Sequence, residues 1–177
     1  FDDGRAGAGL IDLFTTARRA ASGGTVRVFA FDLPGGVVGT IATPEVAAML
    51  NTPRDQFMAE TAVAAIEDWS ARQGPGIAVL LAGSLHSRIV RYPEIDEPHL
   101  GELLVERFPQ LVTLEGHWTG GQFRAATSPR GAEIHDAQGI PTPAGSIGRH
   151  YRDEEVQRYG HHGWVNVGLL TPSLPLG

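Results

Sequence analysis

The feature that most constrains the fold is the apolar run Gly76–Ala82, which leads through a tight turn to His86. The run is short, rich in Ile, Val and Leu, and flanked by glycines, a pattern typical of a central parallel strand that is covered on both faces. Gly83 would let the backbone turn sharply where the strand ends. Ligands of open α/β sheets bind outside the carboxyl ends of the strands, so His86 is a candidate functional residue. The alternative is a histidine that only hydrogen-bonds to loop backbone.

The composition is that of an ordinary globular protein and excludes several classes of function. The chain has 177 residues and a formal net charge of −6, and its 14 basic residues are all arginine. We find no basic patch, so nucleic acid is not an expected partner. The absence of cysteine excludes disulfides, zinc–thiolate sites and cysteine catalysis. No apolar run is long enough to span a bilayer. The first residues read as the interior of a longer protein, so we expect a processed or truncated chain.

Helical and extended patterns alternate along the chain. We expect helices at 7–22, 51–72, 99–107 and 153–158, strands at 25–32, 76–82, 110–115, 122–127 and 164–170, and mostly loop over 128–160. This order predicts a single α/β domain with a layered, mainly parallel sheet, helices on both faces and an antiparallel hairpin near the C-terminus. Met58 and Trp69 share the apolar face of the second helix and are expected to be buried.

Several polar residues should converge at the carboxyl edge of this sheet, because they follow strands or precede helices. They are Asp3, Arg5, Asp32, Arg54, Asp55, His86, Glu115 and His117. Each alone has a structural reading, such as a helix cap for Asp55 or a surface charge for Arg54. Convergence at the edge where α/β proteins bind ligands favours a functional reading of the set. The absence of a Gly-x-Ser-x-Gly elbow disfavours a serine hydrolase, and His99 lies in a loop without metal-ligand spacing.

Two short motifs carry a resemblance to a known superfamily. The helix start Arg54-Asp55-Gln56-Phe57-Met58-Ala59 and the strand end Gly83-Ser84-Leu85-His86 resemble the second half of the ChaN, TIKI/TraB and erythromycin-esterase superfamily. The segments 3–5, 28–32 and 163–173 are similar to its bacterial ChaN-like branch. The superfamily's first motif, Gly-Glu-x-His, has no match in this chain. We therefore expect the chain to be the C-terminal two thirds of a longer domain, completed by a missing N-terminal portion or by a homodimer.

The resemblance implies different activities in different branches. The esterase branch implies a hydrolase of an ester or amide, in which His86 is the general base, Arg54 holds an anionic or carbonyl group, and Asp55 or Asp3 orients a partner. The TIKI branch implies a metal-dependent peptidase with His86 as a ligand, and ChaN implies a haem-binding protein without turnover. Arg5, Asp32, Glu115 and His117 would contact the substrate. A catalytically inactive structural domain is a further alternative. The cofactor, if any, is haem or a divalent metal, and the bacterial branch is compatible with a periplasmic protein or a processed lipoprotein.

Overall fold

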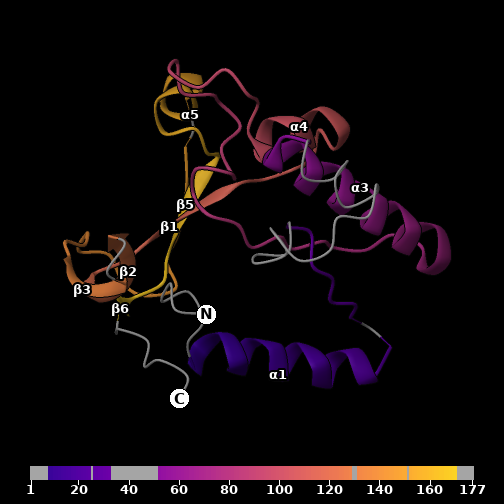
Figure 1. Ribbon diagram of the computed structural model, residues 1–177, viewed down its shortest axis with the longest axis horizontal. Helices are drawn as coiled ribbons and strands as arrows, with labels where there is room; N and C mark the ends of the chain where they lie inside the picture. Colours follow the sequence, from indigo (N-terminus) through magenta and orange to yellow (C-terminus); the bar gives the residue numbers. More distant parts are fainter. Residues whose placement is uncertain (1–7, 25, 33–51, 129–130, 151, 171–177) are drawn as a thin grey trace. The chain divides into compact units, whose positions relative to one another are not determined.

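The computed structural model describes residues 8–24, 26–32, 52–128, 131–150 and 152–170 (Figure 1). They belong to two compact units. One unit comprises Phe1–Val28, Gly116–Ile147 and Val165–Gly177, and the other, here called the helical unit, comprises Phe29–Glu115 and Gly148–Trp164. Asp3, Arg5 and the connection 33–50 lie outside the described residues. That the chain belongs to one longer α/β domain stays a prediction.

The four expected helices are present, and glycines end three of them. They are α1 (Ala8–Ser22), α3 (Arg54–Gln73), α4 (Leu100–Arg107) and α5 (Asp153–Tyr159). After α1, the N–H groups of Gly23 and Gly24 bond back to carbonyls of its last turn. Gly74 and Gly160 follow α3 and α5 with φ values of 83° and 75°, a region that glycine enters at little cost.

The core of the helical unit lies between α3 and α4, which run side by side (Figure 1). The buried apolar residues are Met58, Ala59, Ala62, Leu100 and Leu104. Around them pack the partly buried residues Phe29, Phe31, Val63, Leu80, Leu103, Phe108 and Leu111. Met58 is 3% exposed, which confirms its expected burial, whereas Trp69 is only half-buried.

The sheets are small and mixed. One has the strand order β1 (Leu114–His117), β5 (Gly163–Asn166), β4 (Ile147–Arg149), and the other the order β3 (Gly131–Ala137), β2 (Gly120–Ser128), β6 (Leu169–Leu170). Strand β2 pairs antiparallel with β3 and parallel with β6. The helices and the two three-stranded sheets agree with the predicted α/β class. A layered, mainly parallel sheet is not observed among the described residues.

The C-terminal strands correct two expectations and meet a third. Strands β3 and β4 lie in the stretch expected to be mostly loop. The expected antiparallel hairpin is present and is formed by β2 and β3. The expected last strand is divided into β5 and β6 at Gly168, whose φ of 89° interrupts the extended chain. Gly121 allows the close approach of β6, since a Cβ there would lie 2.1 Å from the Leu170 carbonyl oxygen.

The two strands expected at the centre of the sheet are not assigned as strands. Residues 26–32 and 76–82 carry no strand, and the 76–82 segment makes no backbone hydrogen bond with another described residue. One side of this segment packs through Leu80 on the α3–α4 core. The other side is open, because Ile77, Val79 and Leu81 are 95%, 79% and 67% exposed. Without a neighbour to pair with, an extended segment is not a strand.

Across the part of the chain described, no helix is both long and apolar enough to cross a membrane.

Candidate functional site

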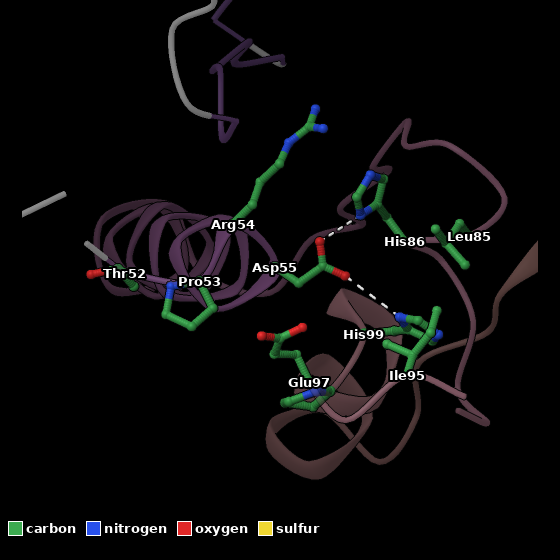
Figure 2. Close-up of a pocket in the computed structure, with 10 residues that line it drawn as sticks. Thr52, Pro53, Arg54, Asp55, Leu85, His86, Ile95, Glu97 and His99 are labelled. Carbon is green, nitrogen blue, oxygen red and sulfur yellow. Dashed lines mark hydrogen bonds and ion pairs between the residues drawn. The ribbon is translucent and has the colours of Figure 1, made fainter. Parts of the chain in front are cut away.

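A cavity of about 460 Å³ lies in the helical unit where three segments meet. The start of α3, the loop after residues 76–82 and the segment before α4 each supply part of its wall (Figure 2). The lining residues are Thr52, Pro53, Arg54, Asp55, Leu85, His86, Ile95, Glu97, Pro98 and His99.

The central feature of the cavity is a hydrogen-bonded pair formed by Asp55 and His86. The Nδ1 atom of His86 lies 2.5 Å from Oδ1 of Asp55 (Figure 2). Since an ionised carboxylate can only accept, Nδ1 carries a proton, and in the neutral form of the ring the lone pair is on Nε2. The side chains are 23% and 12% exposed, so the pair is shielded but reachable from the cavity.

The N-terminus of α4 fixes the geometry of this pair. The first N–H groups of a helix have no partner within the helix and need other acceptors. The N–H of Leu100 donates to Oδ2 of Asp55 at 3.0 Å, and the N–H of Gly101 donates to the carbonyl of His86 at 2.9 Å. Both members of the pair are therefore held by the same helix start, one through its side chain and the other through its backbone.

Gly101 makes this arrangement possible. A Cβ at this position would lie 2.3 Å from the carbonyl oxygen of Arg88 and 2.5 Å from that of Ser87. Only glycine lets the loop that carries His86 approach the first turn of α4 so closely.

His99 belongs to the site, although its sequence context did not indicate this. The residue is 3% exposed and caps α4 in a capping box with Glu102. Its Nδ1 lies 3.8 Å from Oδ2 of Asp55, and its Nε2 has no hydrogen-bond partner. Burial of Glu102 would by itself raise the pKa of this carboxyl. The hydrogen bonds from Arg91 and from the His99 N–H outweigh burial and lower the pKa of Glu102. The spacing His99-x-x-Glu102 is the sequence signal that could have placed His99 at a helix start.

Arg54 lines the cavity, but its guanidinium is engaged elsewhere. Its Nε donates to Oδ1 of Asp32 at 2.9 Å, and its Nη2 donates to the other carboxylate oxygen. The hydrogen bonds to Asp32, and to a smaller extent the charge of Asp55, raise the pKa of Arg54 against the opposing effect of partial burial. The positive charge of Arg54 is therefore already compensated by the Asp32 carboxylate.

The other described residues of the predicted set do not line the cavity. Asp32 is bonded to the lining residue Arg54, and Glu115 and His117 lie in β1. Asp3 and Arg5 fall outside the described residues. The structure thus brings Arg54, Asp55 and His86 together, and places Asp32 next to Arg54.

A hydroxyl–imidazole pair, Ser87 and His161, is present in the helical unit and does not line the cavity. The Nδ1 of His161 lies 3.0 Å from the carbonyl of Tyr159 and must be protonated, so its Nε2 accepts from the Ser87 hydroxyl at 3.0 Å. Burial lowers the pKa of His161, which is fully inaccessible. This pair joins the loop after His86 to the end of α5.

The described residues contain no group of three or more His, Asp or Glu side chains arranged to hold a metal ion. His86 offers one nitrogen, Nε2, because Asp55 occupies the other. The residues observed therefore do not form a metal centre around His86.

Comparison with known proteins gives no relative for this chain. No protein-family model matches it, and neither a curated protein nor a solved structure is significantly similar. The superfamily resemblance stays a prediction.

Proposed function

We propose that this protein is a hydrolase in which His86 is the general base toward an ester or amide. The observation that carries the proposal is the Asp55–His86 hydrogen bond of 2.5 Å at the wall of a cavity of about 460 Å³. A base oriented by a carboxylate within hydrogen-bond reach is a recurring element of hydrolytic sites.

The reaction follows from the tautomer of His86. Its Nε2 takes a proton from a water molecule as the water oxygen attacks the carbonyl carbon. The Asp55 carboxylate stabilises the imidazolium that forms and holds the ring in place. The bond to the leaving alcohol or amine then breaks, and the imidazolium returns its proton to the leaving group. Water is the only co-reactant that this hydrolysis requires.

The superfamily resemblance supports the same roles for Asp55 and His86, since its two motifs meet at one cavity wall. We also propose that residues 26–32 and 76–82 become strands of a layered, mainly parallel sheet when a further strand pairs with them. The open apolar side formed by Ile77, Val79 and Leu81 supports this, because a central strand is covered on both faces. The missing strand would come from an N-terminal portion or from a second copy of the chain.

The haem- or metal-binding alternative has no comparable observation in its favour. No group of three or more His, Asp or Glu side chains among the described residues is arranged to hold a metal ion.

Hydrolysis of a panel of p-nitrophenyl esters and p-nitroanilides tests the proposal. His86→Gln should lower kcat/KM by about 10²–10⁴-fold, which is the usual contribution of a general base. His150→Gln is a matched control, because it makes the same change at a histidine that does not line the cavity. Unchanged kcat/KM in a folded His86→Gln variant, or a folded wild type that hydrolyses none of the panel, would contradict the proposal.

A further inference from the structure

The charges around the cavity indicate which ligands it can accept. Arg54 is the basic residue of the wall that is charged at every physiological pH. Its guanidinium points away from Asp55 and Glu97 (Figure 2), and it is bonded to Asp32. Because Asp32 compensates this charge, the arginine does not offer a free cation to an anionic ligand.

The opposite charge is available in the cavity. Glu97 lines the wall and has no hydrogen bond or ion pair with the described part of the chain. In Figure 2 the Asp55 carboxylate is directed toward His86 and His99, no dashed line reaches the Glu97 carboxylate, and the Arg54 guanidinium points away from both. The cavity wall therefore holds two carboxylates, while its one guanidinium is already paired with Asp32.

The rest of the wall is apolar. Pro53, Leu85, Ile95 and Pro98 supply hydrocarbon surface beside the two carboxylates. A negative site with apolar walls suits an alkylammonium group, which carries a positive charge inside a hydrocarbon shell.

We propose that the cavity selects substrates that carry an organic cation, with Glu97 as the residue that determines this specificity. This inference rests on the proposed hydrolase function, and it replaces the expected role of Arg54 as the residue that holds an anionic group. The cation lies against Glu97 while the scissile carbonyl faces Nε2 of His86.

Two esters that differ only in charge test the inference. Acetylcholine and 3,3-dimethylbutyl acetate have nearly the same shape, but only the first is a cation. One ion pair in a partly exposed site contributes up to about 1 kcal/mol, which corresponds to about fivefold in kcat/KM. We expect the wild type to prefer acetylcholine by about fivefold and Glu97→Gln to remove most of this preference. Glu94→Gln is the matched control, since Glu94 lies three residues away and is not a lining residue.

The outcomes separate the two proposals. Equal kcat/KM for both esters, or a preference that Glu97→Gln leaves intact, overturns the cation selectivity while the hydrolase function stands. If neither ester is hydrolysed, a binding measurement tests the cation selectivity instead. Choline should then shift the amide resonances around Glu97 at concentrations several-fold lower than 3,3-dimethylbutan-1-ol does. Equal or weaker binding of choline overturns the inference.

Discussion

The sharpest structural prediction concerns Gly101→Ala. Alanine normally stabilises a helix by about 1 kcal/mol relative to glycine, so propensity alone predicts a gain. Here the new Cβ would lie 2.3 Å from the Arg88 carbonyl oxygen and 2.5 Å from that of Ser87. Both contacts are with backbone, which cannot move aside by changing a rotamer. We place the overpacking cost near the upper end of its usual range, at about 3 kcal/mol, which leaves a net loss of about 2 kcal/mol.

Thermal unfolding followed by circular dichroism measures this loss. For a chain of this size 1 kcal/mol corresponds to about 2–4 °C, so Gly101→Ala should lower Tm by about 4–8 °C. The loop that carries His86 would also be displaced, and hydrolysis should fall with stability. Gly116→Ala is the control, since its Cβ would meet nothing within 4 Å. A Tm for Gly101→Ala equal to or above that of the wild type would refute the close packing of α4 on this loop.

Three further predictions address the core, the buried histidines and the open apolar side. Met58→Ala should lower the free energy of unfolding by about 2–5 kcal/mol in a denaturant titration, because Met58 is 3% exposed in the α3–α4 core; a loss under 1 kcal/mol would show that α3 packs by another face. Burial lowers the pKa of His161, so the folded protein resists a proton that the unfolded chain accepts. Stability should be full above about pH 6.5 and fall as the pH drops toward the lower folded pKa, and Tm measured against pH should show a weaker decline in His161→Gln. Ile77→Lys should leave Tm of the isolated chain within a degree or two while Leu80→Lys lowers it strongly, and a large loss for Ile77→Lys would show that a further strand already covers this side.

The helices were predictable from the sequence because their signals are local. Pro53 at the start of α3, Gly74 at its end and the apolar spacing between them act within a few residues. The sheets were not predictable in the same way, since strands depend on partners that are distant in the sequence. Residues 131–137 have no apolar alternation, yet they form β3 because β2 lies beside them.

The candidate site was likewise predictable only in part from the sequence. The proximity of Asp55 and His86 agrees with the prediction, although the parallel sheet from which it was argued is not observed among the described residues. The engagement of Arg54 by Asp32 could not be read from the sequence, since it depends on where residues 26–32 pass α3. His99 was missed for a related reason: its role comes from the α4 N-terminus, where it caps the helix and faces Asp55.

Asp55 has a structural role and, in the proposed reaction, a chemical one, and this decides which substitution is informative. Its Oδ2 accepts the Leu100 N–H at the start of α4, while its Oδ1 orients His86. Any substitution of Asp55 removes or weakens both interactions, so a loss of activity would not distinguish a damaged helix start from a lost orienting charge. His86→Gln removes the imidazole and leaves the carboxylate on the helix, as well as the backbone carbonyl that accepts the Gly101 N–H. Loss of hydrolysis in that variant with an unchanged Tm would therefore assign the chemistry to the imidazole and the scaffold to α4.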